Sequence, residues 1–266
     1  MTEAELERLD KEEQKETEKA ILLILALYAG LWNKLESMTY ELFGKYAEDG
    51  RLTLQNMRRS LDSSELKKFN STYGSSYARL SRMNAFLHTL RREIYSLEDE
   101  YERILRELGR TIVGMETSAF DTSLDDIEDI LITRWGADNL NFIERIAKSG
   151  DQLFAKLVLE LKRRLAMGES VEDVLSELDK LIEIAKRAAK NSVVTEASAV
   201  STNAQREIFK ALGVTKYKYY ALVDERMCEI CGSLHGKTFL MSNFEIGVTA
   251  PPIHRSCRCR IEPVID

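Results

Sequence analysis

Residues 228–259 read CEICGSLHGKTFLMSNFEIGVTAPPIHRSCRC. The composition of this stretch distinguishes the C-terminal part of the chain from everything that precedes it. It contains all four cysteines and two of the three prolines, and the remaining proline is Pro263. No proline precedes Pro251, whereas an average usage of about 5% would place roughly a dozen there. Because proline interrupts helices, we expect a long helical body followed by a short, chemically distinct C-terminal module.

The overall composition limits the class of protein. The chain has 266 residues, of which 44% are hydrophobic and 31% are charged, so it is long and apolar enough to form a core. A formal net charge of -6 argues against nucleic-acid binding over the whole surface, which requires a basic excess. A local basic patch is compatible with this charge.

Apolar periodicity indicates the helices of the body. Apolar residues recur every three or four positions in 80–101 and again in 171–189, the spacing that buries one face of a helix. A last helix is expected over 193–212, because Gly213 is a typical residue to follow a helix end.

Two further interruptions of the helical pattern are expected. Residues 148–151 (KSGD) separate two apolar faces, and residues 167–169 (MGE) end the second of these helices. Ser170, with Asp173 three residues later, has the spacing of a cap for the next helix.

The N-terminal region combines a charged segment with an apolar one. Thr2 and Glu5 have the spacing of a capping box, and no strong helix breaker follows before Lys45. A continuous helix of that length would be about 60 Å long, so we expect its charged first half, residues 3–19, to project as an arm. The apolar run at 20–32 (AILLILALYAGLW) is shorter than the roughly 20 residues that cross a bilayer. We therefore expect a buried helix and no membrane span, with an interfacial membrane helix as the alternative.

The C-terminal module is expected to be a small sheet with long loops. Short strand patterns occur in 214–222, 237–240 and 258–261. A unit of this size is near the limit at which a hydrophobic core alone is sufficient, so we expect an additional staple.

Five side chains in this module are candidate metal ligands. Cys228 and Cys231 form a C-x-x-C pair, and His254, Cys257 and Cys259 form H-x-x-C-x-C. Zinc takes four such ligands, so three cysteines with the histidine, or all four cysteines, are both compatible with the spacing. Metal binding can supply roughly 10 kcal/mol of apparent folding energy, and we predict a structural zinc as the cofactor.

Several other interpretations of the cysteines stay open. They are two disulfides, a C-x-x-C redox pair, or buried thiols without a metal. Catalytic zinc is disfavoured because no H-x-E or H-E-x-x-H motif is present. His88 fits a helix surface and His235 a turn before a strand. No nucleotide-binding or nucleophile motif occurs, so we predict no catalytic residues and no enzyme.

The module also contains a local basic patch. Arg255, Arg258 and Arg260, together with Lys237, form this patch in an otherwise acidic chain. This group is either a solvated face or a contact for DNA phosphates or an acidic protein.

These motifs resemble the C-terminal signature of the phage Mu-type head morphogenesis family, the minor head proteins of tailed bacteriophages. That signature reads approximately D-x-R-T-C-x-x-C, then a G-K-x-F turn, then P-x-H-x-x-C-R-C. The corresponding residues here are 224–231, 234–239 and 251–259. Met227 replaces the usual Thr, and His235 replaces a common Asp.

The resemblance extends upstream to about residue 130. Trp135, 142–146, 167–170, 195–196 and Asn203 are similar to the helical part of the family.

The expected organisation is a mainly α fold, with a long-helix bundle body and a small C-terminal α+β, Cys/His-rich, zinc-stapled module. Its expected parts are an extended helical arm and helical bundle at 1–130, the helical part of the head-morphogenesis domain at 131–213, and the Cys/His module at 214–266.

The resemblance implies a minor head protein that is associated with the portal and acts in procapsid assembly and in DNA packaging or delivery. The implied partners are the phage portal protein and the scaffold or major capsid protein, with DNA contacted through Arg255, Arg258 and Arg260. The implied location is the virion, in the head interior or portal region, with the host cytoplasm during assembly.

Two other functions compete with this one. The first is a zinc-dependent nucleic-acid-binding or nuclease module, suggested by the Cys/His cluster and the arginines. The second is an enzyme related to phage-borne transferases, for which Thr195 and Glu196 would be the only sequence feature.

Overall fold

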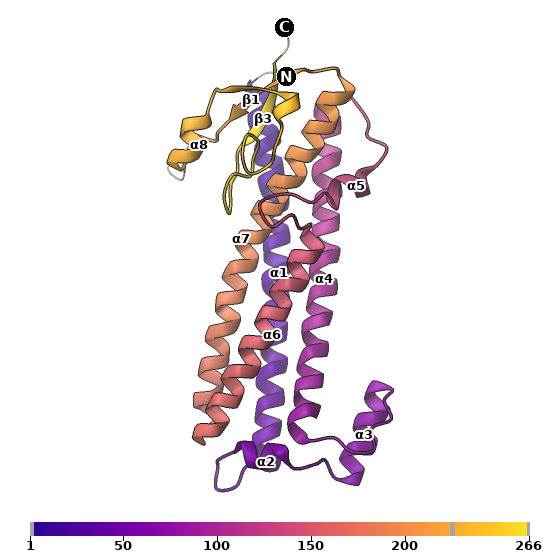
Figure 1. The fold of residues 1–266 in the computed structure, drawn as a ribbon, viewed down its shortest axis with the longest axis vertical. Coiled ribbons are helices and arrows are strands. Elements are labelled where there is room, and N and C mark those ends of the chain that lie inside the picture. The colour runs from indigo at the N-terminus through magenta and orange to yellow at the C-terminus, as the bar shows by residue number, and fades with distance from the viewer. Residues whose placement is uncertain (1–2, 224–226, 265–266) are drawn as a thin grey trace. The chain divides into compact units, whose positions relative to one another are not determined.

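The computed structural model of the chain describes residues 3–223 and 227–264, and Figure 1 shows its elements in chain order. The predicted mainly α fold with a small C-terminal sheet is confirmed. The described helices are α1 (Glu3–Tyr46), α2 (Leu54–Arg58), α3 (Ser63–Tyr73), α4 (Arg82–Ala119), α5 (Ile127–Leu131), α6 (Phe142–Met167), α7 (Val171–Ala211) and α8 (Glu229–Leu234), with a 3-10 turn at Met241–Asn243. The strands are β1 (Lys216–Tyr220), β2 (Thr238–Leu240) and β3 (Arg260–Val264).

Some of the expected helix ends differ from those observed. The turn at 167–170 is confirmed, with Gly168 at a φ of 66° and the Asp173 N–H donating to Ser170 Oγ at 3.2 Å. In contrast, α6 continues through 148–151 and α7 through 190–192. Gly150 is a packing residue in α6, since a Cβ there would lie 1.7 Å from Glu98 Oε1.

The chain divides into two compact units by its packing. Unit 1 comprises Met1–Leu25, Tyr101–Ile146 and Arg187–Asp266, and unit 2 comprises Ala26–Glu100 and Ala147–Lys186. The predicted parts 1–130, 131–213 and 214–266 follow the chain order instead, so the two divisions are not equivalent.

The C-terminal sheet belongs to unit 1 and has the antiparallel strand order β2-β1-β3. Tyr217 pairs with Phe239 on one side and Pro263 on the other. Strand β1 alternates along its length, with Tyr217 and Tyr219 fully buried and their neighbours half-buried. Tyr217 packs in an apolar cluster with Phe209, at the end of α7. The sheet therefore begins directly from the last turn of the long helix.

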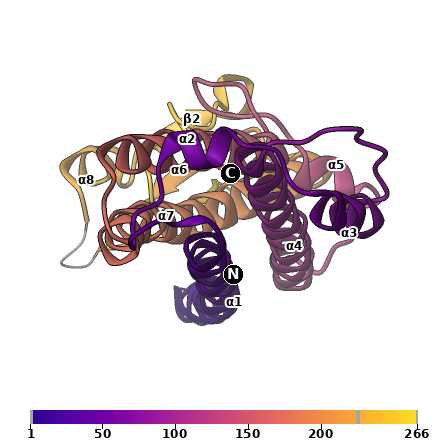
Figure 2. The ribbon, with the colours of Figure 1, turned by 90° about the horizontal axis from the view of Figure 1, so that it is seen from below.

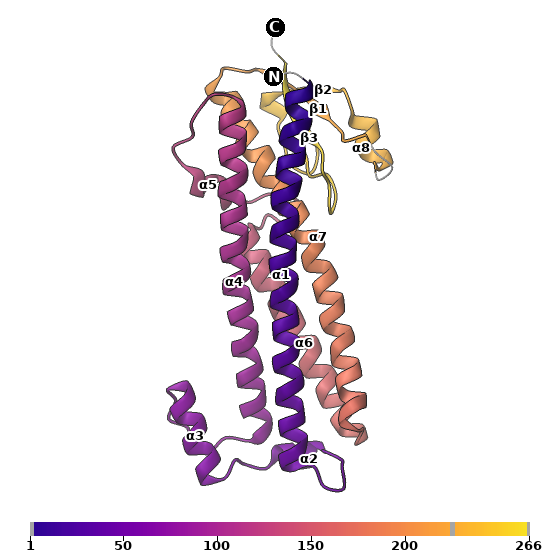
Figure 3. The ribbon, with the colours of Figure 1, turned by 180° about the vertical axis from the view of Figure 1, so that it is seen from behind.

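The first part of α1 is packed within unit 1. Leu6 and Leu9 are 7% and 6% exposed, and Ala20 is also buried. Figure 3 shows this segment beside β3, where Asp10 accepts a hydrogen bond from Arg260. The expectation of a projecting arm is therefore wrong, because one face of this helix is buried in unit 1, and that face includes the partly buried Asp10 and Glu13 as well as the leucines.

Helix α1 also contains the apolar run. An 18-residue window of this helix has a mean hydropathy of 1.3, and 28% of the window is buried. By length and composition, α1 is the single helix of the described residues that is suited to cross a membrane, although core helices of soluble proteins pass the same test. Ile24 is fully buried, whereas Leu22 and Leu23 are 67% and 55% exposed. The run is thus buried on one face rather than all round.

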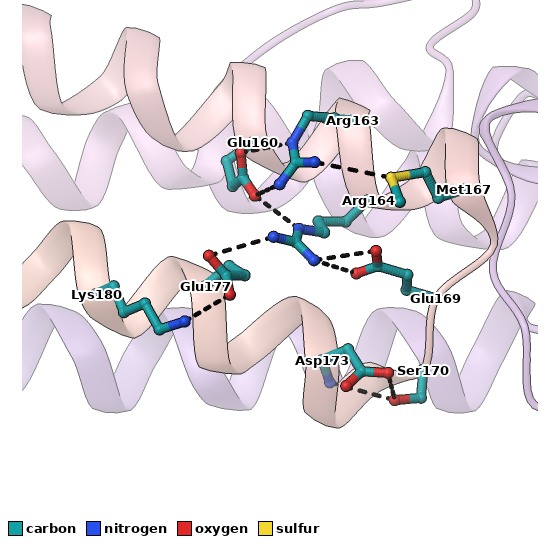
Figure 4. Close-up of polar contacts among 9 residues, drawn as sticks. All are labelled: Glu160, Arg163, Arg164, Met167, Glu169, Ser170, Asp173, Glu177 and Lys180. Carbon is teal, nitrogen blue, oxygen red and sulfur yellow. Dashed lines mark hydrogen bonds and ion pairs between the residues drawn. The ribbon is translucent and has the colours of Figure 1, made fainter.

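Unit 2 is organised around leucine-rich helix faces and a polar hairpin. Figure 2 shows α3 beside the start of α4, where His88 packs edge-on against Phe69 and Tyr73. At the turn between α6 and α7, Arg164 binds carboxylates on both sides of the hairpin, as Figure 4 shows. Its partners are Glu160, Glu169 and Glu177.

Candidate metal centre

The five predicted ligands lie on short elements of the C-terminal module in unit 1. Cys228 caps the N-terminus of α8, where its Sγ accepts the N–H of Cys231 at 3.4 Å. His254 and Cys257 lie in the loop before β3, and Cys259 immediately precedes that strand. Ser256 in this loop has a φ of 58°, a backbone conformation that is uncommon for a residue with a side chain.

The structure brings all five side chains into one cluster. Cys228, Cys231 and His254 form one group, and Cys231, Cys257 and Cys259 form a second; within each group the candidate ligand atoms lie within 4.8 Å of one another. Cys231 is common to both groups, so it lies at the centre. Its Sγ is 3.2 Å from His254 Nε2 and 3.8 Å from Cys257 Sγ.

The imidazole of His254 is oriented for a ligand role. Its Nδ1 lies 2.8 Å from the carbonyl oxygen of Arg255. A carbonyl oxygen accepts only, so Nδ1 carries the hydrogen and the lone pair of Nε2 faces Cys231. Metal-binding histidines commonly have their second nitrogen held in this way.

The four thiols have different tendencies to ionise. A hydrogen bond from Cys259 lowers the pKa of Cys257 to about 5, and the backbone N–H of Cys231 lowers the pKa of Cys228. Burial raises the pKa of Cys231 to about 11. The hydrogen bond between Cys259 and Cys257 raises the pKa of Cys259. Because the thiolate is the form that binds metals, Cys257 and Cys228 are the sulfurs most ready to do so.

Tyr219 is a site residue that the sequence analysis missed. It is fully buried in β1, and its hydroxyl donates to Cys231 Sγ at 3.4 Å and lies 3.9 Å from Cys257 Sγ. Burial raises the pKa of Tyr219, so the phenol keeps its proton as a donor to sulfur. The alternation along β1 was the available signal, since it places Tyr219 on the same face as Tyr217.

The structure does not support disulfides in this module. All four cysteines are free thiols, of which Cys231 and Cys257 are buried. The 3.8 Å between these two sulfurs is far longer than the roughly 2.05 Å of a disulfide bond. A converging set of soft donors fits zinc better than a hard cation.

The other two histidines lie outside the cluster. His235 accepts the Ala221 N–H at its Nδ1 and packs against Tyr220. It orders the turn before β2, as expected. His88 lies between aromatic rings in unit 2.

Arg260, predicted to contact DNA, is in fact buried. It is 4% exposed and binds both carboxylate oxygens of Glu116 and one of Asp10. Glu116 is fully buried and also accepts hydrogen bonds from Ser201 and Gln205. Arg260 and its neighbour Ile261 are both buried at the start of β3, and Arg260 joins the sheet to α4 and α1 instead of facing solvent. Arg255 is exposed and Arg258 half-buried.

Glu196, the only sequence feature for an enzyme, is also engaged in the interior. It is 6% exposed and accepts hydrogen bonds from Arg145 at 3.2 Å and from Trp135 Nε1 at 3.3 Å. The Arg145 guanidinium stacks over the Trp135 ring at 4.0 Å. Thr195, which precedes Glu196 in α7, accepts the backbone N–H of Ser256 at 2.8 Å with its hydroxyl oxygen. This hydrogen bond holds the His254–Cys257 loop against α7.

Part of the family signature lies outside the described residues. These residues are Asp224, Glu225 and Arg226, which precede Cys228 in the signature.

A comparison with known protein families identifies the segment that contains this centre. Residues 155–262 match the family model described as "Phage Mu protein F like protein". No curated protein and no solved structure matches the chain. The matched segment extends from α6 into β3 and includes all five candidate ligands. Residues 155–262 of this chain are therefore similar to the phage Mu protein F like family.

Proposed function

We propose that this chain is a structural and assembly protein of a tailed bacteriophage head. The observation that carries the proposal is the family match over residues 155–262, which supports a role in phage head morphogenesis. In finer detail, we propose a minor head protein that associates with the portal and acts in procapsid assembly and in DNA packaging or delivery.

The geometry of unit 1 supports a structural role over a catalytic one. Glu196 is committed to Arg145 and Trp135, and Thr195 to the Ser256 backbone. The Cys/His cluster has a buried centre at Cys231 and Cys257. Catalytic zinc sites keep an open coordination position, whereas structural sites take four protein ligands.

The proposed cofactor is one structural zinc held by three cysteines and His254. The residues proposed are Cys228, Cys231, His254 and Cys257. Tetrahedral sulfur ligands at about 2.3 Å from zinc lie about 3.8 Å apart, which is the observed separation of Cys231 and Cys257. Cys259 would then remain a neighbouring thiol that hydrogen-bonds to Cys257.

The proposed location is the virion, with the host cytoplasm during assembly. The test is quantitative mass spectrometry of purified procapsids and heads from the source phage or induced prophage, which counts this chain relative to the portal. A few to some tens of copies per head are expected. Absence from both particles would contradict the proposal.

A matched variant shows whether the metal centre matters for incorporation. Particles are prepared with Cys228→Ser/Cys231→Ser and, separately, with Cys259→Ser. We expect the first variant to reduce incorporation and the second to leave it unchanged.

A further inference from the structure

The strongest local excess of positive charge lies in unit 2, far along the chain from the metal centre. Residues 51–92 contain nine arginines and lysines but only two acidic residues, in a chain whose net charge is -6. The exposed bases of this segment are Arg51, Arg58, Arg59, Lys67, Lys68, Arg79 and Arg92. A concentration of one sign of charge in an acidic protein is the electrostatic signature of an anionic partner.

Hydrogen bonds connect the loop after α3 to α3 and to the segment after α2, the three places that carry most of these basic residues. Asn70 follows Lys67 and Lys68 on α3, and its side chain donates to Tyr77 O at 2.9 Å and accepts from Tyr77 N at 3.1 Å. Two residues later, Arg79 donates to Ser60 Oγ at 2.7 Å.

The segment that follows α2 is connected to the loop that precedes α4. Ser60 pairs with Ser81, and the Arg82 N–H donates to the carbonyl oxygen of Arg59 at 3.0 Å. Arg58 and Arg59 are therefore joined through these contacts to Arg79 and to α3. We call the surface formed by Arg58, Arg59, Lys67, Lys68 and Arg79 the basic surface.

The two acidic residues of the segment are engaged within it. The Asp62 side chain caps α3 by accepting the Glu65 N–H at 2.8 Å, and Glu65 accepts the Asp62 N–H at 3.0 Å and a hydrogen bond from Tyr46. Arg59 forms an ion pair with Glu48. Within 3–223 and 227–264, Arg58, Lys67, Lys68 and Arg79 have no carboxylate at salt-bridge distance. Apart from the influence of Lys68 on Glu41, whose pKa is lowered by Lys45 and more weakly by Lys68, their charge is available to a partner.

The remaining chemistry of the surface favours phosphates over an acidic protein. Ser71 and Ser76 are exposed in the same segment and offer hydroxyl donors, which commonly bind nucleic-acid phosphates. Among the described residues of 51–92, the large hydrophobic side chain that is exposed is Tyr77, at 43%. Protein interfaces normally contain a larger apolar core, so the small exposed apolar area of this segment favours a polyanion such as DNA over a protein partner.

We propose that the basic surface of unit 2 binds the phosphate backbone of duplex DNA without sequence specificity. This inference rests neither on the family match nor on the metal centre. Binding through phosphates releases counterions, so the affinity must fall steeply with salt.

The test measures binding of the full chain to a fluorescent duplex of about 30 base pairs at several salt concentrations between about 50 and 200 mM. The variant is Arg58→Glu/Lys67→Glu/Lys68→Glu. The matched control is Lys148→Glu/Lys156→Glu/Lys162→Glu, which makes the same charge change at exposed residues of α6 in the same unit. Circular dichroism verifies that both variants remain helical, and Lys67→Gln/Lys68→Gln replaces the first variant if it does not fold.

We expect the first variant to bind at least about tenfold more weakly at low salt and to reduce the slope of log affinity against log salt by about three. The control should stay within about twofold of the unmodified chain. Equal weakening by both triple variants, loss of binding only in Arg255→Glu/Arg258→Glu, or no binding at low salt would each overturn the proposal. Stronger binding to polyglutamate than to DNA would also overturn it, and would indicate an acidic protein partner.

Discussion

Arg260 in unit 1 and Arg164 in unit 2 both bind several carboxylates, but they do so over very different chain distances. Arg260 reaches Glu116 and Asp10, which lie 144 and 250 residues away, and its side chain is 5% exposed. Arg164 binds carboxylates of its own hairpin, and its side chain is 16% exposed. The buried ion-pair network around Arg260 in unit 1 is therefore long-range, whereas the network around Arg164 in unit 2 is local and closer to the surface.

The largest effect is expected from removing the metal ligands of unit 1. In Cys228→Ser/Cys231→Ser, residues 227–264 should lose protection from hydrogen exchange, because structural zinc contributes roughly 10 kcal/mol of apparent folding energy. The helices of unit 2 should keep their protection. Hydrogen exchange with mass spectrometry measures both regions in one experiment.

Cys259→Ser is the matched control, since Cys259 lies outside the proposed ligand set. It should retain the protection of β1 and β3. If these strands stay equally protected in Cys228→Ser/Cys231→Ser, a metal does not stabilise the C-terminal module of unit 1.

The second largest effect is expected from Arg260→Met. Removing one partner of a buried ion pair typically costs 3–5 kcal/mol, because the other charge stays buried without a partner. Here Glu116 would lose its cation. We expect the free energy of unfolding of unit 1 to fall by about 3 kcal/mol in denaturant titrations.

Arg258→Met provides the comparison, because it changes a neighbouring arginine that is half-buried. It should cost less than about 1 kcal/mol. Equal costs for the two variants would show that the position of Arg260 in the interior is unimportant.

A smaller effect is expected from the pH dependence that Glu13 introduces into unit 1. Burial, and then the nearby Glu116, raise the pKa of Glu13 well above 4.5. As the pH rises above 4.5, the unfolded chain loses this proton while the folded chain keeps it, so the stability falls with rising pH. Glu13→Gln removes that dependence, and the variant should gain stability relative to the unmodified chain between about pH 5 and 8.

Glu98→Gln makes the same change in unit 2. Burial raises the pKa of Glu98 to about 7, so the relative gain of this variant should begin above pH 4.5 and level off near pH 7. Thermal unfolding over a pH series measures both variants. A Glu13→Gln difference that is independent of pH would contradict a protonated Glu13 in the folded chain.

The smallest effect is expected for Arg164→Met in unit 2. Its ion pairs are local and close to solvent, so they are screened by salt. We expect the thermal midpoint to fall by about 2 °C at low salt and by less at high salt. A fall as large as that of Arg260→Met would abolish the distinction between the two units.

The sequence predicted best what local chemistry determines. The turn at 167–170 and the convergence of Cys228, Cys231 and His254 depend on residues close together in the chain or on a strong donor pattern. The sequence predicts both features. Metal binding by the cluster stays a prediction.

What could not be predicted depends on contacts between distant segments. Nothing near Arg260 in the sequence indicates that Glu116 neutralises it, so the sequence alone is compatible with a solvated face or with a contact for DNA phosphates or an acidic protein. The burial of Leu6 and Leu9 could not be predicted, because charged residues surround them in the sequence. Their packing holds the first part of α1 in unit 1. Gly150 resembled a helix end, but it is a site of close packing with Glu98.

Native mass spectrometry of the freshly purified chain, with elemental analysis, tests the metal-stapled module most directly. We predict one zinc per chain in the unmodified protein and in Cys259→Ser, and none in Cys228→Ser/Cys231→Ser. A metal-free chain whose residues 227–264 are nevertheless protected from exchange would contradict a structural zinc.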